Sequence, residues 1–358
     1  MRLSLTIEES NALKGIALLL LLVHHLFYIQ DGKYEDISIV GHGLIHAIGI
    51  ICKVCVAIFV FLSGYALGTT IKENSKIDIK RFYIRRFSKL FLNYWFIWLL
   101  FVPIGLVIFD RSFDKVYDNP IWVNALLDFF GLINTTGKYG YNPTWWFYSC
   151  IILLYAVFPL ISWSISKNSR LIWFWIAVSF LTAFTDLMFL QPIRFYLFPF
   201  VVGIFISNSL TICNLHRQGG GNYRYCILKK RVFNFIQSGL GITTLLLLLI
   251  ISFIIRLSIP YAILWDTIIT LIIVLLYKAV RLADKINKSL VFLGKHSFNI
   301  FLFHTFIYYL YFPFLIYWSR NPLLIFLSLL ASSIVLSIGL EKLKEWIGFY
   351  KLQNKLKI

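Results

Sequence analysis

The chain has 358 residues, of which 59% are hydrophobic and only 14% are charged. A soluble domain carries about a quarter charged residues, so this composition excludes a water-soluble fold. The net charge of +18 would suggest nucleic-acid binding in a soluble protein, but here the cations lie in loops between apolar segments. The expected partner is therefore the lipid bilayer, and no nucleic acid is expected.

Apolar segments of about twenty residues recur along the chain, and each can cross roughly 30 Å of hydrocarbon. The first resembles a signal peptide, but no small-residue cleavage site ends it, so we interpret it as a retained helix. In chain order, the predicted helices cover residues 11–29, 43–71, 88–109, 143–165, 171–189, 193–211, 236–257, 260–280, 295–317 and 322–341. The sequence thus predicts an all-α, polytopic membrane protein with about ten transmembrane helices. We expect a single membrane-embedded domain over residues 1–358 and no soluble domain.

Lysine and arginine are concentrated in every second loop. Residues 1–14, 72–89, 167–170, 217–231, 278–295 and 342–357 hold 26 of the 34 basic residues. The remaining eight lie in the alternate loops or within helices. Because cytoplasmic loops carry such an excess, both the N-terminus and the C-terminus are predicted to be cytoplasmic.

Ionisable residues inside a spanning helix are costly, and they mark either a functional site or a structural pair. In the first helix, Lys14 and His25 are eleven residues apart, which places them on one face about 16 Å apart along the axis. His24 points about 80° away from Lys14, so His25 is the better candidate to share a site with it. An imidazole can remove a proton from an attacking hydroxyl. A histidine that only forms a hydrogen bond between helices would give the same pattern.

A group of cations surrounds the start of the third predicted helix. Arg81, Arg85 and Lys89 recur at intervals of four residues, which places them on one helix face. Arg86 lies beside Lys89 at an interval of three. Guanidinium groups suit phosphate oxygens, but an anchor for lipid headgroups would need the same cations.

The second predicted helix carries two hydroxyl groups, on Ser63 and Tyr65. Gly64 between them permits close backbone approach, so a site of helix packing explains the same residues. Lys53 lies in this helix and Asp186 lies in the fifth. These two residues are candidates for an intramembrane charge pair.

Together these motifs resemble the acyltransferase type 3 family of bacterial integral-membrane acyltransferases. The first helix matches a basic residue, ten intervening residues and a histidine, here Lys14 and His25. The segment Phe61–Tyr65 is similar to the family's Ser-Gly-aromatic motif. The segment Arg85–Lys89 resembles its R-x-x-R motif, with Lys89 in place of the second arginine, so the charge is kept but the bidentate geometry is lost. Similar segments continue at Trp145–Pro159, Arg194–Gly203 and Gly294–His304, so the resemblance covers nearly the whole chain.

The resemblance implies an O-acyltransferase, most often an O-acetyltransferase, whose donor is acetyl-CoA or another acyl-CoA. The implied acceptor is a hydroxyl of an envelope polysaccharide, a lipopolysaccharide or a lipid-linked saccharide. The implied location is the bacterial plasma (inner) membrane, with several passes. Some relatives carry an extra extracytoplasmic domain after the last helix, and this chain resembles the stand-alone type.

With this resemblance we predict that His25 is catalytic, either as a general base or as a covalent acyl carrier. Lys14 would fix the donor or orient the first helix. Ser63 and Tyr65 would donate hydrogen bonds near the thioester carbonyl. The phosphates of the donor would bind the cations, which are Arg81, Arg85, Arg86 and Lys89.

Two other classes remain open from the residues themselves. A transporter or flippase of glycolipids would use the intramembrane charges as a substrate path, although inverted repeats are not evident. A glycan polymerase would place its site on the large outward loop at residues 110–142. No metal is expected, because His42 and His46 have the spacing of ligands on one helix face but lack a third ligand.

Overall fold

The computed structural model describes residues 4–39, 42–71, 78–218, 234–259, 263–280 and 282–355. Each of the ten predicted helices has a counterpart. These are α1 (Ile7–Phe27), α2 (Leu44–Ile51) continued by the 3₁₀ turn η1 (Cys52–Val54) and α3 (Cys55–Gly68), α4 (Ile79–Ile108), η3 (Pro143–Trp145) continued by α7 (Trp146–Lys167), α8 (Leu171–Thr182), α9 (Leu197–Gln218), α11 (Gly239–Ser258), α12 (Ile263–Ala279), α13 (Asp284–Thr305) continued by the π-helix η5 (Phe306–Tyr311) and α14 (Pro313–Tyr317), and α15 (Pro322–Trp346).

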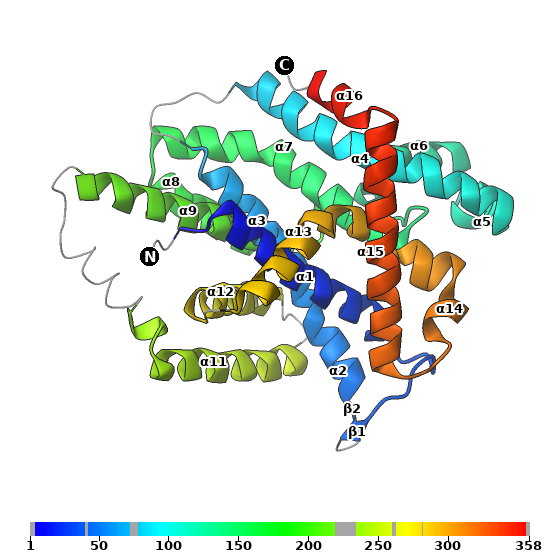
Figure 1. Cartoon of the computed structure of the whole chain (residues 1–358). Helices are drawn as coiled ribbons and strands as arrows, with labels where there is room; N and C mark the ends of the chain where they lie inside the picture. The colour runs from blue at the N-terminus through cyan, green and yellow to red at the C-terminus, as the bar shows by residue number, and fades with distance from the viewer. Residues whose placement is uncertain are drawn as a thin grey trace.

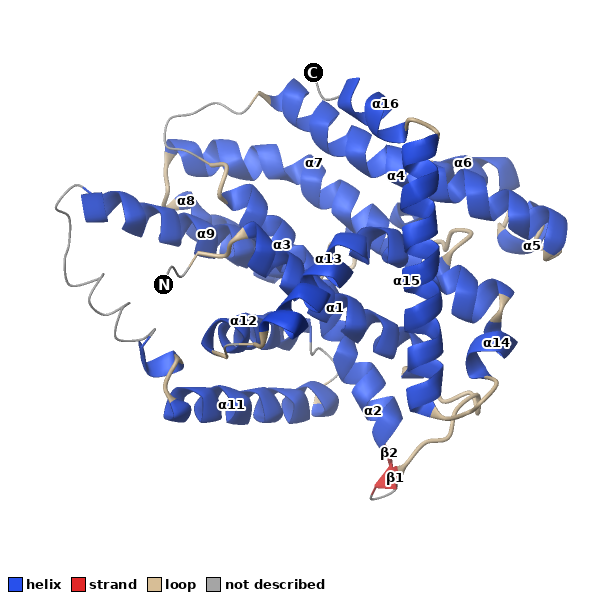
Figure 2. Ribbon diagram, in the orientation of Figure 1, coloured by secondary structure: helices blue, strands red, loops and turns tan. Residues whose placement is uncertain are grey.

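The remaining elements lie in the connections. They are the strands β1 (Ser38–Ile39) and β2 (His42–Gly43), the helices α5 (Phe113–Val116), α6 (Ile121–Phe129) and α16 (Phe349–Lys355), and the 3₁₀ turns η2 (Ile133–Thr136) and η4 (Met188–Leu190). The two strands form a hairpin at the tip of the loop between α1 and α2 (Figure 2). The all-α, polytopic membrane fold is confirmed.

Among the described residues, seven helices are both long enough and apolar enough to cross a membrane. They are Ile7–Phe27, Leu44–Gly68, Ile79–Ile108, Pro143–Lys167, Gly239–Ser258, Asp284–Tyr311 and Pro322–Trp346. Helices α8, α12 and the apolar part of α9 are shorter. The count of ten spans and the cytoplasmic location of both termini therefore stay predictions.

Two helices begin well before the predicted residue. Helix α4 begins at Ile79, where the side chain of Asp78 accepts a hydrogen bond of 2.9 Å from the backbone N–H of Arg81 and caps the helix. Helix α13 begins at Asp284, and its residues are exposed or half-buried until the first buried one, Leu290. The apolar pattern of the sequence does not extend into these first turns, because their charged side chains lower the mean hydropathy.

Two helix pairs are packed closely through glycine, and they hold the centre of the bundle. Helices α1 and α13 cross there (Figure 1), and a Cβ added at Gly15 or at Gly294 would collide with the backbone of the other helix. Helices α3 and α9 meet in the same way at Gly64 and Gly203. Small residues let helix backbones approach in a membrane, so Gly64 has the packing role that its sequence context allowed.

A buried polar cluster joins three helices at the end of α15. The ammonium group of Lys344 is fully buried and donates to Asn93 Oδ1 on α4 at 2.8 Å and to Asn299 Oδ1 on α13 at 2.7 Å. Its third partner is Glu341 Oε1, one turn earlier on α15, at 3.1 Å. An ammonium group has three protons, so all of its hydrogen-bonding capacity is used. We call these four residues the Lys344 cluster.

Candidate functional site

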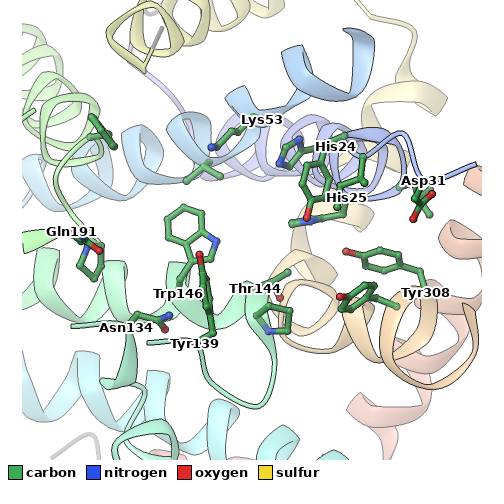
Figure 3. A pocket seen from close by; sticks show the side chains of 18 of the residues that line it. His24, His25, Asp31, Lys53, Asn134, Tyr139, Thr144, Trp146, Gln191 and Tyr308 are labelled. Carbon is green, nitrogen blue, oxygen red and sulfur yellow. The ribbon is translucent and has the colours of Figure 1, made fainter. Parts of the chain in front are cut away.

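A cavity of about 610 Å³ lies at the end of the bundle that the sequence predicts to face outward. Its walls come from the last turn of α1, the turn η1, the loop before α7, the segment before α9, and the region of η5 and α14. Figure 3 shows His24 and His25 on one wall, with Thr144 and Tyr308 facing them from another. Because these segments are far apart in the sequence, the cavity is a product of the tertiary fold.

Aromatic and polar side chains dominate the lining. The aromatic residues are Tyr28, Tyr139, Trp146, Phe195, Tyr196, Tyr308, Tyr309 and Tyr317, and the ionisable or amide residues other than histidine are Asp31, Lys33, Lys53, Asn134, Lys138 and Gln191. Lys33 pairs with Asp31 at 2.6 Å. Flat aromatic faces combined with hydrogen-bonding groups suit a polar ligand that also has apolar faces.

The two neighbouring histidines of α1 have different roles. His24 Nδ1 lies 2.8 Å from the carbonyl oxygen of Gly49, so His24 links α1 to α2. His25 lines the cavity, and within the described residues no hydrogen bond engages its ring nitrogens. Its ring centroid lies 5.0 Å from that of His304 and 6.2 Å from that of Tyr308. The sequence preference for His25 over His24 is consistent with this geometry, although its catalytic role stays a prediction.

His304 is a residue of this site that sequence reasoning did not select. It lies in the last turn of α13, is fully buried, and touches His25 from the opposite helix. The only indication of this residue in the sequence was its position at the end of Gly294–His304, a segment that resembles the family. Spacing along one helix cannot reveal a contact between the first span and a late one.

Lys53 also lines the cavity, in the short 3₁₀ turn between α2 and α3. Asp186 is not its partner, because the Asp186 carboxylate forms a 2.5 Å ion pair with Arg194. The carboxylate that interacts with Lys53 belongs to Asp266, which is also bound at 2.6 Å by the buried Arg256. The suggested Lys53–Asp186 pair is therefore wrong. The stretch between Ala183 and Arg194 turns back on itself, with Arg194 Nε donating to the Ala183 carbonyl at 3.0 Å.

The other three predicted catalytic residues lie towards the opposite end of the bundle. Lys14 does not line the cavity, and its charge interacts with that of Lys89 on α4. The hydroxyl of Tyr65 accepts a 2.8 Å hydrogen bond from the backbone N–H of Leu5, near the start of the chain. Ser63 is half-buried on the same stretch of α3. Lys14 and His25 therefore do not share this cavity, because about 16 Å of helix separates them.

The predicted donor-binding cations follow the first turns of α4. Arg81, Arg85 and Lys89 are exposed, and Arg86 is half-buried with its guanidinium carbon 6.0 Å from the ring centre of Tyr155. No carboxylate among the described residues forms an ion pair with any of the three arginines. Exposed guanidinium groups without acidic partners can bind an anionic ligand such as a phosphate.

The loop between α1 and α2 is held by Asp36. Its carboxylate accepts hydrogen bonds from the backbone N–H groups of Ile45 at 2.8 Å and His46 at 3.2 Å, at the start of α2. Burial alone raises the pKa of Asp36, but these bonds and one from Gln30 outweigh it and lower the pKa. His46 Nδ1 lies 3.3 Å from the carbonyl oxygen of Phe27. The side chain of His42 lies outside the described residues, and no group of three or more metal-ligating side chains occurs within them.

Comparison with known proteins identifies the class of activity. Residues 7–342 match the model of a family described as an acyltransferase domain. No curated protein and no solved structure matches the chain. The family match favours acyl transfer over the transporter and polymerase alternatives. Since it covers nearly the whole sequence, the chain belongs to this acyltransferase family and is a multi-pass membrane acyltransferase.

Proposed function

We propose that this protein transfers an acyl group, specifically acetyl, from a coenzyme A thioester to a hydroxyl of a saccharide bound in the outward-facing cavity. The observation that carries the proposal is the imidazole of His25, which borders a tyrosine-rich cavity of about 610 Å³ and has no hydrogen-bond partner among the described residues. The acceptor is an envelope polysaccharide, a lipopolysaccharide or a lipid-linked saccharide. The site of action is the inner membrane of a bacterium.

The lining of the cavity supports a saccharide acceptor. A sugar ring has apolar C–H faces and a rim of hydroxyls, so it needs aromatic surfaces and hydrogen-bonding groups together. Tyr139, Trp146 and Tyr308 supply aromatic surface, and Asn134 and Gln191 supply amide groups. A lipid tail would instead require a lining without these polar groups.

The cations of α4 support a coenzyme A donor that enters from the cytoplasmic side. The phosphates bind Arg85 and Arg86, with help from Arg81 and Lys89, because guanidinium groups match phosphate oxygens. Lys14 extends this positive region into the bundle, since its charge interacts with that of Lys89. The thioester arm then follows α1 over the roughly 16 Å between Lys14 and His25. Ser63 and Tyr65 contact the arm in the inner half of the protein.

The chemical step uses His25 as general base. Its imidazole takes the proton of the acceptor hydroxyl as the hydroxyl oxygen attacks the thioester carbonyl carbon. The tetrahedral intermediate then collapses, the C–S bond breaks, and His25 returns the proton to the departing thiolate. In the alternative, His25 first accepts the acyl group itself and then passes it to the hydroxyl, which predicts ping-pong kinetics.

The experiment uses purified protein in lipid nanodiscs, labelled acetyl-CoA and a bacterial envelope glycan extract. The wild type should form an alkali-labile ester on the glycan. His25→Ala should lower kcat by roughly 10²–10⁴-fold, the range for loss of an acid–base group, with unchanged thermal stability. The matched control is His296→Gln on α13, because His296 does not line the cavity. Full activity in His25→Ala would refute the assignment of the base.

A second variant tests the donor site. Arg86→Ala should raise the KM for acetyl-CoA about tenfold and leave the acceptor KM unchanged, because it removes a charged hydrogen-bond donor. Lys351→Ala, which removes an exposed cation from α16, should leave both constants unchanged. An unchanged KM for acetyl-CoA in Arg86→Ala would instead mean that the cations of α4 only anchor the helix at lipid headgroups.

A further inference from the structure

The hydrogen bonds of His304 fix its tautomer. Its Nδ1 lies 3.0 Å from the carbonyl oxygens of both Ile300 and Phe301, one turn earlier on α13. A carbonyl oxygen can only accept a hydrogen bond, so Nδ1 must carry the hydrogen. In the neutral ring, Nε2 then carries a lone pair and acts as an acceptor.

This acceptor has no partner among the described residues. His304 Nε2 is inaccessible to solvent and makes no hydrogen bond, although a buried polar atom left unpaired is costly. Such an atom in a native protein is often explained by a functional role. His304 is otherwise fully enclosed, so a donor for Nε2 has to come from the side chains that touch its ring.

Among the described residues, two aromatic side chains with polar hydrogens lie against the His304 ring. Tyr308 stacks on it, with centroids 5.8 Å apart and an interplanar angle of 18°. The lone pair of Nε2 lies in the plane of its ring, so a hydroxyl on a nearly parallel ring is badly placed to donate to it. His25 approaches at 5.0 Å with an angle of 50°, which allows a ring N–H to turn towards Nε2. His25 is therefore the better donor.

Hydrogen bonds hold the turn that carries His304, whereas no hydrogen bond among the described residues holds the ring of His25. The turn of α13 that carries His304 is fixed by hydrogen bonds from Trp145 Nε1 to the Leu302 carbonyl at 2.9 Å and between the hydroxyls of Thr144 and Thr305 at 2.9 Å. His25 borders open cavity instead. A small rotation of its side chain therefore closes the gap between the two rings.

We propose that His304 is a positioning residue for His25, and this inference rests on the function proposed above. One ring N–H of His25 donates to His304 Nε2, which leaves the other ring nitrogen of His25 unprotonated and directed at the acceptor hydroxyl. When His25 takes the proton of that hydroxyl, the hydrogen bond to His304 stabilises the resulting imidazolium. His304 keeps its own Nδ1 proton throughout, and the proton on His25 passes to the departing thiolate. The pair follows the logic by which a buried acceptor orients a catalytic histidine.

The test compares two substitutions of His304. His304→Gln keeps an acceptor near the position of Nε2, whereas His304→Leu has a similar size and no acceptor. In the acetyl-transfer assay, His304→Leu should lower kcat at least tenfold, less than His25→Ala, with an unchanged acceptor KM. His304→Gln should recover most of this loss, and His296→Gln on the same helix should match the wild type. If His304 only packs the helices, the Gln and Leu variants should instead lose kcat to the same extent, and their thermal stability should fall as well.

A second readout needs no substrate. ¹⁵N NMR of labelled histidine reports which ring nitrogen carries the proton, and the His25 signal is identified by its loss in His25→Gln. The wild type and His304→Gln should show one fixed tautomer for neutral His25, and His304→Leu should show a mixture. The same tautomer and the same kcat in His304→Leu would overturn the pairing. That result together with an inactive His25→Ala would leave the proposed function intact, whereas an active His25→Ala would refute the choice of base.

Discussion

Lys344 and His304 are both fully buried polar side chains, and they lie near opposite ends of the bundle. Lys344 uses all three protons on Asn93, Asn299 and Glu341. His304 uses one ring nitrogen, and its other nitrogen has no partner among the described residues and lies in a ring packed against the cavity-lining His25. The satisfied ammonium group of Lys344 joins three helices, whereas the unsatisfied nitrogen of His304 leaves a place for a donor from a neighbouring side chain. Burial alone therefore does not distinguish these two residues, but their hydrogen bonds do.

The largest effect on stability should come from breaking the Lys344 cluster. Lys344→Met removes the cation and leaves the amide oxygens of Asn93 and Asn299 without their donor. The Glu341 carboxylate keeps its hydrogen bonds from Asn299 and Tyr350 but loses its positively charged partner. Loss of one partner from a buried charged cluster costs about 3–5 kcal/mol. Denaturation in detergent should show this loss, and Lys342→Met, at an exposed position on the same helix, should not.

A double variant sharpens this result. Lys344→Met combined with Glu341→Leu removes both charges, so it should be more stable than Lys344→Met alone. A single variant as stable as the wild type would show that the cluster does not hold the helices together. Lys344 could then no longer serve as the structural residue in the comparison with His304.

A smaller effect should follow from separating α1 and α13, the helices that carry His25 and His304. Gly294→Leu forces a side chain against the backbone of Asn11, and overpacking of this kind costs about 1–3 kcal/mol. Gly339→Leu is the control, because a Cβ at Gly339 meets no atom within 4 Å. We expect Gly294→Leu to lower both the melting temperature and kcat. Full activity in this variant would mean that close packing is not needed to hold the two histidines together.

The smallest effect concerns an exposed loop, where hydrogen bonds compete with water. Asp36→Ala removes the cap of α2 and should cost about 1 kcal/mol. The pKa of Asp36 is lowered in the folded protein, so its stabilisation is complete at neutral pH and is lost as the pH falls below about 4. Melting curves of the wild type and Asp36→Ala should converge in acid, and Glu35→Ala should show no such convergence. Parallel curves at all pH values would contradict the capping role.

The sequence predicted the helices well because crossing a bilayer requires long apolar segments, and these are local features. It predicted the starts of α4 and α13 poorly, because the charged side chains of their first turns interrupt the apolar pattern. The interruption at Lys53 was also missed, since a 3₁₀ turn keeps the same apolar composition. Local patterns therefore located the helices but not their ends or their irregular turns.

For the candidate site, the sequence shows only relations between residues that share one helix. Periodicity separated His25 from His24, and the cations of α4 followed from their spacing. The contact between His25 and His304 and the pairing of Asp186 with Arg194 depend on how the chain folds back on itself. Lys14 and His25 lie on one face of α1, but a shared face does not imply a shared cavity. The distance along the axis decides that question.

The close packing of α1 against α13 has a consequence for biogenesis. During synthesis the first span enters the membrane long before α13, the helix that packs against it. Lys278, which donates a hydrogen bond to the carbonyl of Ser4, is also synthesised late, just before α13. During that interval the polar side of the first span faces lipid or the insertion machinery. Assembly of the active protein is therefore completed late in translation, and a fragment that stops before residue 284 has a first helix without its main partner.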